Sequence, residues 1–188
     1  IADIISQVDR MSRWVRDLLV SLRPTSDEAE PVELVAAIED TRLAFAQQIE
    51  RNGVQFSYEG AAQYWVASQS LQLTQILNSL FANAVEAMPK GGRLSAQLSE
   101  LEGQQVQLLL SDTGKGMSQQ QERMVFKPFF TTKQGGLGVG LVLVKRIMER
   151  FGGSVSLSSR EEEGTRVCLI FNIAVGEHHG AQHPGSRG

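Results

Sequence analysis

Cysteine is scarce in this sequence, with Cys168 as the single one among 188 residues. One thiol excludes an internal disulfide framework and a zinc site built from cysteines, and it suits a reducing compartment. We therefore expect a cytoplasmic chain. Because Cys168 stands between apolar neighbours, we expect its side chain to be a small buried one.

The sequence also lacks long apolar runs and an excess of either charge. No apolar stretch approaches the roughly 18 residues of a membrane-spanning helix, so we expect no membrane segment in this chain. Its 18 Lys and Arg nearly balance 21 Asp and Glu, for a formal net charge of −3. Such a chain has no long-range attraction for a polyanion, and we expect no nucleic acid partner.

What is present is the composition of an ordinary globular domain, 41% hydrophobic and 21% charged, with a helix in front. Apolar residues of segment 1–23 recur at alternating spacings of four and three, which is typical of a coiled coil or helical bundle. One such helix cannot bury its own apolar seam, so we expect a longer protein or a homodimer through this helix. We expect a polar linker over 24–31, the main domain over 32–174 and a disordered tail over 175–188.

The main domain interleaves helices and strands. Periodicity predicts helices over 71–88 and 139–151 and a further one over 32–51. The predicted strands are 54–58, 65–67, 92–101, 104–111, 154–159 and 165–173, whereas 113–138 shows little regular periodicity. Because neighbouring strands form hairpins, we expect an α+β fold, an α/β sandwich with a mixed sheet.

A polar stripe runs along the predicted helix 71–88. Its members step by three and four, and they are Gln72, Gln75, Ser79, Asn83 and Glu86. A solvated helix face is the plain interpretation. The alternative is that Asn83 offers its amide oxygen to Mg²⁺ carrying nucleotide phosphates, since Mg²⁺ takes few protein ligands beside phosphate and water.

Asp112 follows an apolar strand and precedes two glycines, Gly114 and Gly116. A carboxylate at a strand end can accept a hydrogen bond from an exocyclic amine such as that of adenine, and glycines let the backbone approach a flat base. An ordinary turn is the alternative interpretation.

A second glycine-rich segment, 134–141, precedes the predicted helix 139–151. Exposed backbone N–H groups and the helix dipole favour anionic phosphates there, and Lys133 could reach a terminal phosphate. A flexible loop is the alternative. Phe126, Phe129 and Phe130 lie just before it, as part of a lid or of the core.

Together these segments resemble a known family. Residues 77–87 (LNSLFANAVEA), 112–116 (DTGKG), 126–133 (FKPFFTTK) and 136–141 (GLGVGL) resemble, in order, the N, G1, F and G2 boxes of bacterial sensor histidine kinases. The nitrogen-regulation-like subgroup is the most similar. Segment 1–23 resembles the second helix of that family's dimerisation and histidine-phosphotransfer hairpin.

The resemblance implies a Bergerat-type (GHKL) ATP-binding fold, with helices on one face of a mixed sheet. It implies ATP and Mg²⁺ as cofactors and transfer of the γ-phosphoryl group to a histidine, for relay to an aspartate of a response regulator. Asn83 would bind Mg²⁺, Asp112 would contact adenine, and Asn83, Lys133 and Ser79 would be catalytic. The remaining implied nucleotide-binding residues are Gly114, Gly116, Thr132, Gly136, Gly138, Val139, Gly140, Leu141 and Thr165.

The sequence departs from the family pattern in three places. The family's histidine box is absent, and because the three histidines lie in the tail we expect no phosphoacceptor in this chain. Ser79 stands where the family commonly has Asn. Leu137 and Val139 replace the commoner Thr and Leu of the glycine box.

Other functions stay open beside the kinase. An ATP-hydrolysing relative, such as those of the gyrase or mismatch-repair families, would carry a general-base Glu at the position of Ser79. A protein-serine kinase of the same fold is a further alternative, as is a non-enzymatic module that binds nucleotide or a partner protein.

Overall fold

The computed structural model describes residues 28–131 and 138–174. The predicted helix 1–23, the first part of the linker and the tail lie outside the described residues. Helices are α2 (Leu34–Ala44), α3 (Ala46–Asn52), α4 (Ser70–Ala87), α5 (Gln119–Glu122) and α6 (Gly140–Arg150). Strands are β1 (Glu30–Glu33), β2 (Val54–Glu59), β3 (Trp65–Ser68), β4 (Gly92–Leu101), β5 (Gln105–Asp112), β6 (Ser154–Arg160) and β7 (Gly164–Asn172).

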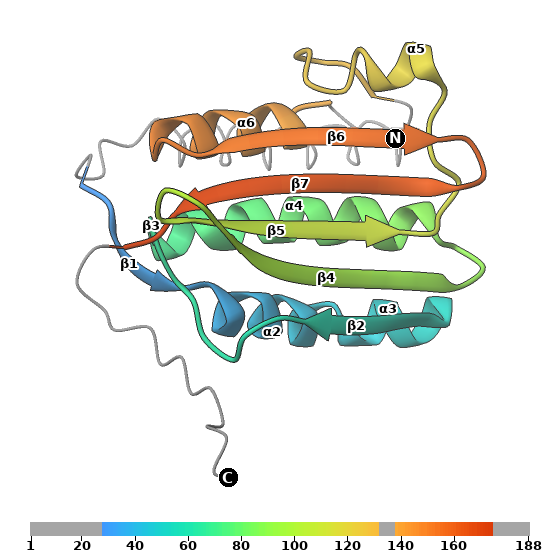
Figure 1. Cartoon of the computed structure of the whole chain (residues 1–188). Helices are drawn as coiled ribbons and strands as arrows, with labels where there is room; N and C mark the ends of the chain where they lie inside the picture. The colour runs from blue at the N-terminus through green and yellow to red at the C-terminus, as the bar shows by residue number, and fades with distance from the viewer. Residues whose placement is uncertain (1–27, 132–137, 175–188) are drawn as a thin grey trace, which may run out of the picture.

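Five strands form one mixed sheet in the order β2-β4-β5-β7-β6. Strands β2 and β4 are parallel, and the other neighbours are antiparallel. Helices α2, α3, α4 and α6 lie on one face of this sheet, and the short α5 lies beyond the β6 edge (Figure 1). The predicted mixed sheet with helices on one face is confirmed.

Helix α4 supplies the centre of the core. Its fully buried Phe81 lies 6.0 Å from the ring of Phe45 and 5.8 Å from that of Phe56. The sheet contributes every second residue of β5, including Leu108 and Leu110, because alternate side chains of a strand point to the same face. Burying each such side chain is worth roughly 1.5–3 kcal/mol, which fixes α4 over the middle of the sheet.

The predicted helix over 32–51 is wrong in its first residues and in its continuity. Strand β1 comes first and pairs antiparallel with β3, so Glu30 and Pro31 belong to a strand and not to the linker. Glu33 ends the strand because its carboxylate accepts the N–H groups of Val35 and Ala36, which caps α2. At Phe45 the chain leaves the helical conformation and starts α3.

Cys168 also differs from expectation, because it is only half-buried. It lies on β7 between the buried Val167 and Leu169, and therefore faces away from the helices. Among the described residues, no helix combines the length and the hydropathy needed to cross a membrane.

Candidate functional site

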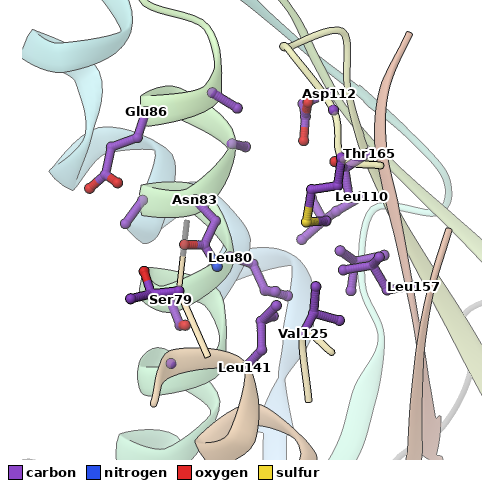
Figure 2. A pocket seen from close by; sticks show the side chains of 18 of the residues that line it. Ser79, Leu80, Asn83, Glu86, Leu110, Asp112, Val125, Leu141, Leu157 and Thr165 are labelled. Atoms are coloured by element: carbon purple, nitrogen blue, oxygen red, sulfur yellow. The ribbon is translucent and has the colours of Figure 1, made fainter. Parts of the chain in front are cut away.

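A cavity of about 590 Å³ opens between α4 and the ends of β5 and β7. Its volume lies within the roughly 300–1,000 Å³ typical of small-molecule sites. Figure 2 shows Ser79, Asn83 and Glu86 on the α4 side, with Asp112 and Thr165 across the cavity from them. The cavity therefore lies between a polar helix face and the ends of two inner strands of the sheet.

The polar stripe of α4 divides into two parts. Ser79, Asn83 and Glu86 line the cavity. Gln72 does not line it and is buried, with a relative exposure of 5%. Of the stripe, only Glu86 is an exposed side chain. A solvated helix face is therefore the wrong interpretation for Gln72, whereas Gln75, Ser79 and Asn83 are partly exposed.

Asp112 ends β5 with its carboxylate at the cavity. Its Oδ1 accepts the backbone N–H of Gly114 at 2.9 Å, and the carboxylate also accepts the backbone N–H of Thr165. Burial raises the pKa of Asp112 above its ordinary value, and these two backbone donors partly oppose that shift. A carboxylate held in this way keeps lone pairs available for a further donor in the cavity.

Two glycines allow the backbone to close around Asp112. Gly164 has a φ of +101°, and a Cβ added there would lie 2.0 Å from the backbone oxygen of Asp112. Gly116 has a φ of +60°, and its Cβ would lie 1.8 Å from the backbone oxygen of Arg160. A side chain at Gly164 would push β7 away from Asp112, and one at Gly116 would push the 115–117 segment away from Arg160.

The amino end of α6 forms the far end of the cavity. Gly138, Val139, Gly140 and Leu141 all line it, and Val139, the residue before the helix, makes no side-chain cap. The first N–H groups of α6 therefore have no intrahelical acceptor and favour an anion. A Cβ on Gly140 would lie 2.7 Å from Ser79 Oγ, so this helix end rests against α4.

The chain before α6 is closed on itself. The N–H of Phe129 donates to the carbonyl of Gly138 at 3.1 Å, so the two ends of the intervening segment meet. Thr132, Lys133 and Gly136, which the resemblance placed at the phosphates, lie outside the described residues. The other residues that the resemblance implied all line the cavity except Gly114, which packs against Ala87 and donates to Asp112.

Apolar residues that the sequence did not single out complete the cavity. They are Leu94, Leu110, Met117, Val125, Leu157 and Val167. The alternation of β5 and β7 could have identified Leu110 and Val167, but nothing in the irregular 113–138 segment marks Val125. An apolar slot with a carboxylate at its end can hold a flat heteroaromatic ring and accept a hydrogen bond from its edge.

The residues present fit a magnesium ion only if a bound ligand supplies most of the oxygen atoms that coordinate it. Within the described ranges no three His, Cys, Asp or Glu side chains gather to hold a metal. Asn83 offers one amide oxygen in the cavity, and Glu86 follows one turn later. Such a sparse oxygen set suits Mg²⁺ that arrives with phosphates and water as its other ligands.

Comparison with known proteins gives one family. Residues 68–175 match the family described as histidine kinase-, DNA gyrase B-, and HSP90-like ATPase. Sensor histidine kinase ZraS of Escherichia coli O157:H7 is 32% identical over 170 residues, which cover 90% of this chain and 37% of that protein. Sporulation kinase D of Bacillus subtilis (strain 168) is 28% identical over 178 residues, covering 92% and 34% respectively. The chain thus spans about a third of the length of these relatives.

Solved structures share the fold. The catalytic domain of histidine kinase ThkA has a TM-score of 0.69 at 24% identity, over 77% of this chain and 96% of that one. Mycobacterial sensor histidine kinase MprB has a TM-score of 0.68 at 23% sequence identity, over 78% of this chain and 99% of that one. The chain therefore belongs to the histidine kinase-, DNA gyrase B- and HSP90-like ATPase family, and it is similar in sequence to a sensor histidine kinase.

Proposed function

We propose that this chain binds Mg-ATP and acts as the catalytic domain of a sensor histidine kinase, transferring the γ-phosphoryl group of ATP to a histidine nitrogen. One observation carries the proposal: the acceptor groups of Asp112 and the start of α6, where Val139 gives no side-chain cap, lie at opposite ends of an apolar-lined cavity. A base at one end and phosphates at the other match this arrangement.

Each residue has a distinct task in the proposal. Asp112 accepts a hydrogen bond from the adenine amine, and Leu110 and Leu157 cover the ring and exclude water. The N–H groups at the start of α6 hold the phosphates. Asn83 ligates Mg²⁺, which when bound withdraws charge from the phosphoryl oxygens.

Phosphoryl transfer by such a site depends on positioning and charge neutralisation. Ser79 lies against the start of α6, and this contact sets the distance between the start of α6 and Asn83. A serine there cannot act as the carboxylate base that would activate water, which favours transfer over hydrolysis. By resemblance Lys133 and Thr132 complete the phosphate contacts.

The proposal includes two protein partners. Histidine kinase ThkA has been solved in complex with the response regulator protein TrrA, and that kinase has a TM-score of 0.73 with this chain at 21% identity, over 93% of this chain and 50% of that one. We infer a response regulator as the final phosphoryl acceptor here, and a homodimer through segment 1–23 in the full-length protein. Membership of the nitrogen-regulation-like subgroup and a cytoplasmic location remain predictions, as does the absence of a phosphoacceptor in this chain.

Calorimetric titration with Mg-ATP tests the nucleotide site. We expect saturable binding that Asp112→Ala abolishes, because the amine then loses its charged acceptor. Binding that persists unchanged in Asp112→Ala would contradict the assignment of the base pocket.

The chemistry needs a separate assay. A histidine-bearing hairpin from a related kinase, supplied in trans with labelled ATP, should acquire acid-labile, alkali-stable phosphate. Alkali-labile phosphoserine would instead identify a protein-serine kinase, and free phosphate without a labelled protein would identify an ATPase. Binding with neither product would favour a non-enzymatic nucleotide module.

A further inference from the structure

Ser159 is a buried hydroxyl that does not line the cavity but touches a residue that does. It lies on β6 with a relative exposure of 8%, opposite Thr165 on β7. Its Oγ is 3.0 Å from the carbonyl oxygen of Gly164 and 2.9 Å from Oγ1 of Thr165. Thr165 in turn lines the cavity and pairs with Asp112 across the sheet (Figure 2).

The protons of these two hydroxyls can be assigned from their partners. The carbonyl of Gly164 can only accept, so Ser159 donates its single hydroxyl proton there. The contact between the two hydroxyls then needs a proton from Thr165, whose Oγ1–H donates to Ser159 Oγ. Thr165 Oγ1 consequently offers only lone pairs to the cavity.

Ser159 is itself held in place. Its backbone N–H donates to Oε2 of Glu122 at 3.3 Å, and Glu122 belongs to α5. That helix starts with a reciprocal capping box between Ser118 and Gln121. Burial and this anchor leave the Ser159 hydroxyl with the Gly164 carbonyl and Thr165 as its partners.

We propose that Ser159 is a positioning residue for nucleobase specificity. Ser159 accepts a hydrogen bond from the Thr165 hydroxyl. The strand ends that line the cavity therefore present only acceptors, the Thr165 hydroxyl oxygen and the Asp112 carboxylate. Acceptors bind the 6-amino group of adenine and repel the 6-oxo group of guanine or hypoxanthine. This inference rests on the proposed ATP site and adds a residue outside the cavity that selects its ligand.

The test is the ratio of dissociation constants for ITP and ATP, measured with Mg²⁺ on the full chain. ITP carries the 6-oxo group without the 2-amino group of GTP, so the ratio reports the edge of the base that faces Asp112. Ser159→Ala frees the Thr165 proton for donation to the 6-oxo oxygen. We expect the ITP/ATP ratio to fall about fivefold to tenfold, the effect of one gained hydrogen bond.

Three further variants separate proton placement from packing. Ser156→Ala removes an exposed hydroxyl from the same strand and should leave the ratio unchanged. Ser159→Thr keeps the hydroxyl and should preserve the wild-type ratio. In a Thr165→Val background, Ser159→Ala should no longer change the ratio, because valine has no hydroxyl proton to donate.

The outcomes are distinct. An unchanged ratio in Ser159→Ala with ATP still bound overturns the inference alone, as does the same fall in the Thr165→Val background. Wild-type protein that binds neither nucleotide overturns the proposed function and this inference with it. If Ser159→Ala does not fold, the nearly isosteric Ser159→Cys carries the test, because a thiol is a weak acceptor and should lower the ratio in the same direction.

Discussion

Replacing Gly164 with alanine should both destabilise the fold and weaken nucleotide binding, whereas the same change at Gly103 should do neither to a comparable degree. Both glycines have positive φ angles, +101° and +78° respectively. A Cβ on Gly103 would meet nothing within 4 Å, but one on Gly164 would lie 2.0 Å from the backbone oxygen of Asp112. The pair therefore separates the cost of backbone conformation from the cost of overlap.

The magnitudes follow from the geometry. A left-handed conformation costs an alanine about 1–2 kcal/mol, which is the whole effect expected for Gly103→Ala. At Gly164, β7 must also retreat by more than 1 Å to reach the 3.4 Å at which ordinary contact begins. Backbone shifts of this kind cost about 1–3 kcal/mol more, and they carry Thr165 away from Asp112, its cross-strand partner.

Urea unfolding of the two variants and wild type, followed by calorimetry with Mg-ATP, measures both effects. We expect Gly164→Ala to lose about 2–5 kcal/mol of unfolding free energy and to bind ATP at least tenfold more weakly. Gly103→Ala should bind ATP as wild type does. Equal free-energy losses in both variants, or unaltered ATP affinity in a folded Gly164→Ala, would refute the argument that this contact holds the proposed base pocket together.

Three other predictions concern the metal, the buried acid and the carboxyl end of β7. Asn83→Ala should weaken binding of Mg-ATP more than that of metal-free ATP, and equal losses in calorimetry would contradict the metal assignment. Asp112→Asn should stabilise the nucleotide-free chain relative to wild type. Burial raises the pKa of Asp112 in the folded chain. The free energy of unfolding of wild type therefore falls as pH rises from about 4 through that raised pKa. The difference in thermal midpoint should therefore grow over this interval and then level, and a difference that shrinks would count against the buried carboxylate. Asn172→Ala should cost about 1–3 kcal/mol in urea unfolding, because its Nδ2 donates to the carbonyls of Phe151 and Gly152 at 3.2 Å each; a loss below 0.5 kcal/mol, the low end for one hydrogen bond, would show that water replaces both donors.

Much of the fold follows from local pattern. The long α4 and the hairpin of β4 and β5 were predicted because their periodicities are strong and their ends carry turn residues. Once neighbouring strands form hairpins, a mixed sheet follows, and α4 must cover its apolar face. Asn83 and Asp112 then come together because they flank the same opening between α4 and β5.

What the sequence did not reveal depends on contacts between distant residues. Strand β1 exists because it pairs with β3, some 35 residues later, and neither strand is longer than 4 residues. Val125 reaches the cavity from a segment without periodicity. Ser159 is one of four serines in β6, and only its contacts with Glu122 and Thr165 distinguish it from the others.

The hydrogen bond between Phe129 and Gly138 has a consequence for how this chain can diverge. Since Phe129 and Gly138 already meet, a change in the number of residues between them need not displace either one. Insertions and deletions there can leave the start of α6 and the wall of the cavity where they are. The end of the cavity at which we propose phosphates to bind can thus acquire new contacts, or lose them, while the opposite end stays under the close packing of Gly164 and Asp112.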